Sequence, residues 1–175
     1  TGFRIGPQSK DDDWLAGEGM KTMWKTAAET RQSICGLINP WDIAETSEWC
    51  AKYPDTPVVI DHFARIGADG TIRDEDVQNL CNLAKHKLVR VKISAYYALG
   101  KKQPPYLDLI PMIKRLFDAY GADRLMWASD CPYSSTAQIP TRHRSPLYTT
   151  IWTLSQQKTA ANCSAQPPRT RSSLQ

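Results

Sequence analysis

The sequence predicts an α/β fold in which parallel strands alternate with helices. Five short runs rich in β-forming residues recur along the first 130 residues, and the stretches between them are long enough to hold crossover helices. Three of the runs are apolar and bounded by polar residues, as strands are when both faces of a parallel sheet are covered.

The predicted strands span residues 2–5, 33–38, 57–60, 88–94 and 124–128. Polar side chains follow four of them at the point where each ends. These residues are Asn39, Asp61 with His62, Ser94, and Ser129 with Asp130. Because the carboxyl ends of parallel strands meet at one edge, where α/β barrels and open α/β sheets bind ligands, we expect a functional site there.

Three helices are predicted from capping residues and apolar periodicity. Asp42 and Glu45 have capping-box spacing ahead of an amphipathic run that ends near residues 53–54. Asp74 precedes an apolar stripe at helical spacing, and a third helix is expected within residues 108–121.

The charge distribution argues against a nucleic-acid partner. The chain has 22 Lys and Arg against 18 Asp and Glu, a formal net charge of +4. No acidic residue follows Asp130, while five basic residues do: Arg142, Arg144, Lys158, Arg169 and Arg171. The excess therefore belongs to the tail and does not form a binding face.

Two further features bear on the compartment. No apolar run approaches the roughly 20 residues that a membrane-spanning helix needs, so no membrane association is expected. The 5 cysteines are scattered and include no C-x-x-C pair, which favours reduced thiols and a cytoplasmic location. The sequence does not indicate the oligomeric state.

The most specific signal is a set of three ordered motifs. They are V-V-I-D-H at residues 58–62, V-K-I-S at 91–94 and R-L-M-W-A-S-D-C-P at 124–132. With these motifs the chain resembles the amidohydrolase-related branch of the amidohydrolase superfamily, which includes 2-pyrone-4,6-dicarboxylate lactonase-like and aminocarboxymuconate-semialdehyde decarboxylase-like TIM-barrel proteins.

The resemblance covers about residues 2–132 and implies strands four to eight of a (β/α)₈ barrel. Residues 1–155 are then the C-terminal part of such a barrel, and residues 156–175 are expected to be irregular. The family's closing helix pattern is not found after Gln157, and back-translation from Lys158 in another frame can give a closer match. We therefore hypothesise a shifted reading frame near Lys158.

The resemblance also bears on a metal cofactor. A His-x-His pair on the first strand of the family has no counterpart in this sequence, and Asn39 stands where metal-dependent members carry a His. An amide oxygen is a poorer zinc ligand than imidazole, so a divalent metal, zinc in the family, is disfavoured here. Asp130 would serve as a metal ligand only if that first strand supplied partners.

The two candidate catalytic residues are His62 and Asp130. A neutral imidazole at a strand end can polarise a carbonyl or move a proton near pH 7, and a carboxylate can activate water. The alternatives are a structural histidine and a carboxylate that caps the turn made with Pro132. Asp61 is expected to point to the opposite side of its strand and to be structural.

The candidate substrate-binding residues are Arg4, Lys92 and Ser94. Lys92 alternates with two apolar residues and should face the barrel interior, and a guanidinium such as that of Arg4 can bind a carboxylate through two hydrogen bonds. Either cation could instead be an ordinary surface charge. Three aromatic residues near the strand ends fit the core better than a pocket: Trp127, Tyr96 and Tyr97. The two other histidines, His86 and His143, receive no role.

The function predicted is hydrolysis of a lactone or related cyclic ester that bears a carboxylate, with a small-molecule substrate. Three alternatives remain. One is a metal-dependent decarboxylase of the same family, and another is a catalytically silent binding or scaffold protein, since half of the family's site is not in this sequence. The third is a complete five-stranded doubly wound protein, whose strand order would reverse at a switch point.

Overall fold

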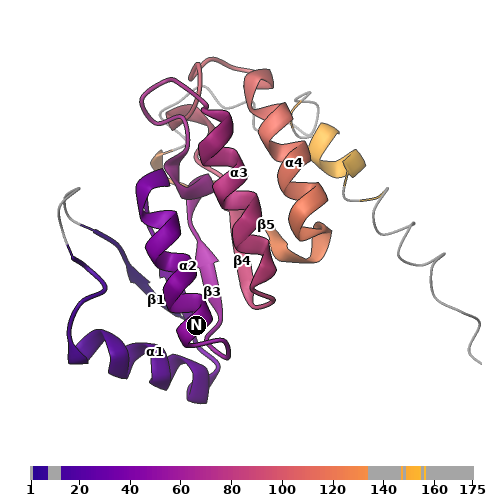
Figure 1. The fold of residues 1–175 in the computed structure, drawn as a ribbon. Coiled ribbons are helices and arrows are strands. Elements are labelled where there is room, and N and C mark those ends of the chain that lie inside the picture. Colours follow the sequence, from indigo (N-terminus) through magenta and orange to yellow (C-terminus); the bar gives the residue numbers. More distant parts are fainter. Residues whose placement is uncertain (1, 8–12, 134–146, 148, 155, 157–175) are drawn as a thin grey trace, which may run out of the picture.

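The computed structural model describes residues 2–7, 13–133, 147, 149–154 and 156. Its centre is a single parallel sheet of five strands in the order β1-β2-β3-β4-β5 (Figure 1). The strands are β1 (Gly2–Ile5), β2 (Ser33–Gly36), β3 (Val58–Ile60), β4 (Val89–Ile93) and β5 (Leu125–Trp127). All five lie within the predicted ranges.

The strand order distinguishes the two α/β architectures that the sequence left open. Each strand pairs in parallel with the next one along the chain, with no reversal. A doubly wound sheet reverses its order at a switch point, whereas a barrel keeps it. The sheet is therefore part of a barrel, and the doubly wound alternative is wrong for the residues described.

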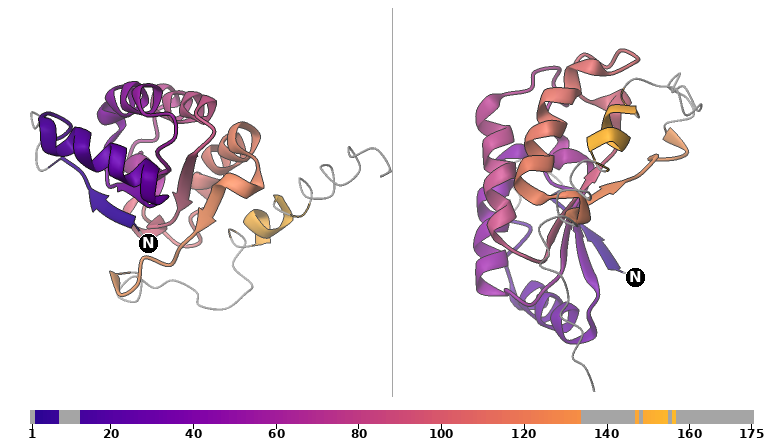
Figure 2. Two further views of the ribbon diagram at one scale, coloured as in Figure 1. Left: turned by 90° about the horizontal axis from the view of Figure 1, so that it is seen from below. Right: turned by 90° about the vertical axis from the view of Figure 1, so that its right-hand side faces the viewer.

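Within residues 13–133, four α-helices accompany the sheet: α1 (Glu18–Thr30), α2 (Ile43–Lys52), α3 (Asp74–Asn82) and α4 (Ile110–Tyr120). The last three lie side by side on one face of the sheet (Figures 1 and 2). The predicted helices correspond to α2, α3 and α4. Pro111 lies in the first turn of α4, where its missing N–H costs no helical hydrogen bond, and Gly121 ends that helix.

The two faces of the sheet differ in character because side chains alternate along a strand. Val89, Val91 and Ile93 are buried in the hydrophobic core that the helices cover. Arg90 and Lys92, between them, are only partly buried and face the other way. The barrel-interior orientation expected for Lys92 is what the structure shows.

The expected capping box at Asp42 and Glu45 is wrong by one turn. Asp42 has helical backbone angles and no side-chain capping bond to α2. Its carboxylate instead accepts hydrogen bonds from the backbone N–H and side-chain amide of Asn39, at 2.8 and 3.1 Å. The 3₁₀ turn Pro40–Asp42 precedes α2, and the capping residues belong to that turn.

Several expectations concern parts of the chain with little or no description. The expected irregular tail and altered reading frame fall almost wholly outside the described residues.

Within the described part, no helix has the length and apolar character to cross a bilayer. The four cysteines in that part, Cys35, Cys50, Cys81 and Cys131, are free thiols. The cytoplasmic location stays a prediction.

Candidate active site at the carboxyl ends of the strands

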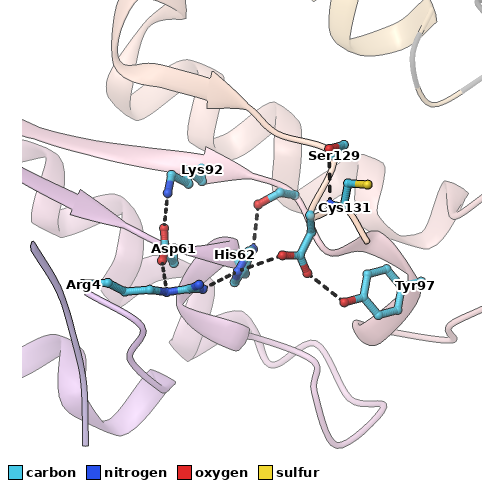
Figure 3. Close-up of polar contacts among 9 residues, drawn as sticks. Arg4, Asp61, His62, Lys92, Tyr97, Ser129 and Cys131 are labelled. Carbon is cyan, nitrogen blue, oxygen red and sulfur yellow. Dashed lines mark hydrogen bonds and ion pairs between the residues drawn. The ribbon is translucent and has the colours of Figure 1, made fainter. Parts of the chain in front are cut away.

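A cluster of polar side chains lies at the carboxyl ends of the strands (Figure 3). Asp61 and His62 follow β3, Ser94 follows β4 and Asp130 comes three residues after β5. Arg4 reaches the same place from β1. The structure thus brings together the predicted residues, although they are spread over more than 120 positions of the sequence.

The chain makes a left-handed turn directly after β3. His62, Phe63, Ala64 and Arg65 all have positive φ angles, between 50° and 57°. Such angles cost a non-glycine residue on the order of 1 kcal/mol or more and persist only when the surroundings impose them. Here Phe63 and Ala64 are completely buried and fix the turn in the core. His62 is therefore held in one orientation.

The hydrogen bonds of His62 define which ring nitrogen carries the proton. Nε2 lies 3.1 Å from Nη2 of Arg4, and Nδ1 lies 2.7 Å from Oγ of Ser94. A guanidinium can only donate, so Nε2 must accept. The proton of the neutral ring is then on Nδ1, which donates to the Ser94 hydroxyl oxygen.

The imidazole is neutral for an identifiable reason. Burial lowers the pKa of His62 below its ordinary value of 6.5, because the charged ring loses hydration. The negative charges of Asp130 and Asp61 oppose that effect, while the positive charges of Arg4 and Lys92 add to it. The ring of His62 is therefore neutral at neutral pH.

Asp130 faces His62 through one carboxylate oxygen and Tyr97 through the other. Its Oδ1 is 3.6 Å from Nε2 of His62, and its Oδ2 accepts a hydrogen bond of 2.7 Å from the Tyr97 hydroxyl. The Asp130 side chain is 18% exposed, so the carboxyl group is within reach of solvent. The carboxylate is directed into the site and does not cap the turn at Pro132.

Tyr97 is a site residue that sequence reasoning assigned to the core. Burial, and then the hydrogen bond and negative charge of Asp130, raise the pKa of its phenol to about 12. The phenol is therefore a permanent donor at neutral pH. Its only signal in the sequence is its position four residues beyond Ile93, where strand β4 ends. Its neighbour Tyr96 is buried and donates a hydrogen bond to the Ile93 carbonyl.

The expected orientation of Asp61 is wrong. Asp61 is 1% exposed, and its carboxylate forms ion pairs with Nε of Arg4 at 3.0 Å and Nζ of Lys92 at 2.7 Å. It therefore lies in the same cluster as His62. The left-handed turn begins at His62, so the alternation of a regular strand does not continue through that residue.

The other predicted residues have defined environments. Ser94 is completely buried and contacts His62, so it can act on a substrate only through the imidazole. Lys92 is 27% exposed, whereas Arg4 is 56% exposed. Trp127 is exposed, and His86 pairs with Ser47 away from the site. His143 lies outside the described residues.

The described residues do not by themselves fit a resident metal ion. A catalytic zinc site takes about three protein ligands, and no group of three or more His, Cys, Asp or Glu side chains converges in this part of the chain. Asn39 donates its amide to Asp42, and a guanidinium lies on Nε2 of His62. Asp130 as a metal ligand stays a prediction that depends on further ligands.

A parallel sheet in barrel order, with a His after β3 and an Asp after β5 at its carboxyl edge, has the arrangement of an α/β-barrel enzyme site. The family model described as amidohydrolase matches residues 1–161. The chain therefore belongs to the amidohydrolase family, as the three sequence motifs predicted.

Known proteins share this similarity over part of their length. L-fucono-1,5-lactonase of Burkholderia ambifaria is 26% identical over 127 residues, which are 73% of this chain and 44% of that protein. 4-Sulfomuconolactone hydrolase of Hydrogenophaga intermedia is 30% identical over 78 residues, 45% of this chain and 25% of that protein. The chain thus spans less than half the length of these relatives.

A solved structure confirms the fold. An amidohydrolase of Burkholderia multivorans, crystallised with bound zinc, superposes with a TM-score of 0.70 at 19% identity. The match covers 94% of this chain and 58% of that one. The five strands therefore correspond to part of a complete barrel of the family, as the sequence predicted.

Proposed function

We propose that the site hydrolyses a lactone that carries an anionic group. The observation that carries this proposal is the pair formed by Nε2 of His62 and Oδ1 of Asp130, 3.6 Å apart at the ends of two strands. The separation is longer than the roughly 2.6–3.2 Å that direct proton transfer needs, so the imidazole and the carboxylate exchange a proton once the contact shortens in the substrate complex.

The reaction uses the pair in two steps. Asp130 accepts a proton from water through Oδ1, and the water oxygen forms a bond to the lactone carbonyl carbon. The tetrahedral intermediate then breaks its ring carbon–oxygen bond. The leaving alkoxide takes up the proton, which passes from Asp130 through Nε2 of His62. One water is consumed and an open-chain hydroxy acid is released.

The surrounding groups support these roles. Tyr97 holds Oδ2 of Asp130, which leaves Oδ1 for the water molecule. Ser94 accepts from Nδ1 and keeps Nε2 directed at the carboxylate. The half-exposed Arg4 supplies a donor with positive charge beside the reacting atoms, where it can stabilise the oxyanion or bind an anionic group of the substrate.

The relatives agree with this substrate class. The names of the two curated relatives describe a sugar lactonase and a sulfomuconolactone hydrolase, both of which act on small lactones. Because the chain covers under half of each, its own turnover and substrate are proposals. The family resemblance and the inward-facing cations of the site favour a lactone with a carboxylate or sulfonate.

The experiment is a hydrolysis panel read by proton release. Lactones with and without a carboxylate are offered to the wild-type chain, together with an aromatic carboxylate whose loss of CO₂ would reveal a decarboxylase. His62→Ala and Asp130→Ala should each lower kcat by roughly 10² or more. Near wild-type turnover in either variant would remove that residue from the mechanism, and CO₂ release would replace the hydrolase by the decarboxylase.

A further inference from the structure

We propose that Arg4 makes the site selective for anionic substrates, because its guanidinium covers Nε2 of His62 until an anion draws it away. This inference rests on the proposed function, since it concerns when His62 becomes able to move a proton. It adds a coupling between substrate binding and the state of the imidazole.

The contact between Arg4 and His62 blocks the atom that the chemistry needs. Nη2 of Arg4 lies 3.1 Å from Nε2, nearer than Oδ1 of Asp130 at 3.6 Å. The lone pair of Nε2 accepts from the guanidinium, and the ring proton is on the far nitrogen, bonded to Ser94. In this arrangement Nε2 can neither take a proton from Asp130 nor hand one to a leaving alkoxide.

An anion competes well for the same guanidinium. A carboxylate or sulfonate attracts the guanidinium through its charge and can accept two parallel N–H···O hydrogen bonds from it, neither of which the neutral ring nitrogen of His62 offers. Arg4 is 56% exposed, so a carboxylate or sulfonate arriving from solvent can reach it. An incoming anion therefore displaces the imidazole from Nη2.

Asp61 keeps the displaced guanidinium in the site. Its carboxylate, 1% exposed, forms an ion pair with Nε of Arg4 at 3.0 Å, while the contact with His62 uses Nη2. Arg4 can thus exchange one partner and retain the other. The substrate anion is then bound next to the freed Nε2, and a lactone without an anionic group leaves the contact closed.

The first measurement needs no variant of Arg4 and no turnover. Long-range ¹⁵N NMR of the labelled chain distinguishes the two ring nitrogens of its 3 histidines, and His62→Gln identifies the signals of His62 by their loss. The expected spectrum has a protonated Nδ1 and an unprotonated, hydrogen-bonded Nε2. A proton on Nε2 in the free chain at neutral pH would overturn the proposal.

The second measurement adds glutarate as the anionic probe and glutaramide as its neutral counterpart. Glutarate should move the Nε2 resonance toward that of a nitrogen without a hydrogen bond, and glutaramide should not. In Arg4→Met the Nε2 resonance should already be that of a nitrogen without a hydrogen bond, even without glutarate. The affinity for glutarate should be weaker by at least about tenfold. Arg73→Met is the matched control, because Arg73 is 54% exposed and paired with Asp69 at a distant place.

The outcomes separate this inference from the proposed function. Unchanged wild-type signals with glutarate, or the same response in Arg4→Met as in wild type, would overturn the selectivity of Arg4 whatever the hydrolysis assays show. Conversely, an anion-dependent response that requires Arg4 supports the inference even if no lactone is turned over, in which case only the reaction is wrong.

Discussion

The buried carboxylate of Asp61 should contribute measurably to stability, which Asp61→Asn tests. The carboxylate is 1% exposed and pairs with Lys92, 27% exposed, and Arg4, 56% exposed. Removing one partner of a shielded polar contact costs about 1–3 kcal/mol, which applies to the ion pair between Asp61 and Lys92. The half-exposed Arg4 adds at most about 1 kcal/mol because water screens it. Asparagine keeps one acceptor oxygen, so we expect a loss of about 2 kcal/mol.

Urea denaturation followed by circular dichroism measures this loss from the midpoint and slope of the transition. The control is Asp69→Asn, which removes an exposed carboxylate paired with Arg73 and should leave the midpoint unchanged. If Asp61→Asn unfolds within about 0.5 kcal/mol of wild type, the carboxylate does not hold the two cations and the role given to Asp61 is refuted.

Three further predictions concern the groups around His62. Ser94→Ala leaves the buried Nδ1–H without an acceptor and should lower the free energy of unfolding by about 1–3 kcal/mol in urea, whereas Ser94→Thr, which keeps the hydroxyl, should lose less. In Asp130→Asn the pKa of Tyr97 should fall from about 12 toward its ordinary value of 10, because the charge that accepts its hydrogen bond is gone while burial remains. A ¹³C NMR titration, with Tyr97→Phe for assignment, measures this pKa. An unchanged pKa would mean that the two side chains do not meet. The folded-state pKa of His62 is lowered from 6.5, so the unfolded chain binds more protons below that pH, and the free energy of unfolding should decrease as pH falls through and below 6.5. Denaturation at several pH values checks this dependence, which should weaken in His62→Gln.

The strands were predictable because their physical causes are local. The apolar run before Asp61 is short, bounded by polar residues and followed by chemistry-bearing side chains, which is what a covered parallel strand requires. The same reasoning located His62 and Asp130, since carboxyl ends of parallel strands converge whatever lies between them. Lys92 was oriented correctly because β4 is regular up to Ile93.

The errors arise where the backbone departs from regular geometry. Nothing in the residue types at His62, Phe63 or Ala64 indicates positive φ angles, which glycine usually supplies, so the side to which Asp61 points could not be read from the sequence. The capping role of Asp42 was placed one turn late because an Asn at position 39 and a Glu at position 45 both offer suitable spacing.

Long-range contacts account for the remaining omissions. The hydrogen bond between Tyr97 and Asp130 joins residues 33 positions apart, and only the folded sheet makes them neighbours. The bond between Arg4 and His62 spans 58 positions. The sequence predicted Arg4 as a candidate anion-binding group, but its contacts with His62 and Asp61 within the chain could not be inferred from spacing.

Lactone hydrolysis in water enriched in oxygen-18, followed by mass spectrometry of the product, tests whether Asp130 activates a water molecule that attacks the lactone carbonyl. Wild type should place one heavy oxygen in the new carboxylate, because water attacks the carbonyl carbon, and Asp130→Asn should do so at least about a hundredfold more slowly. Label in the alcohol oxygen, or equal rates for wild type and Asp130→Asn, would contradict this mechanism.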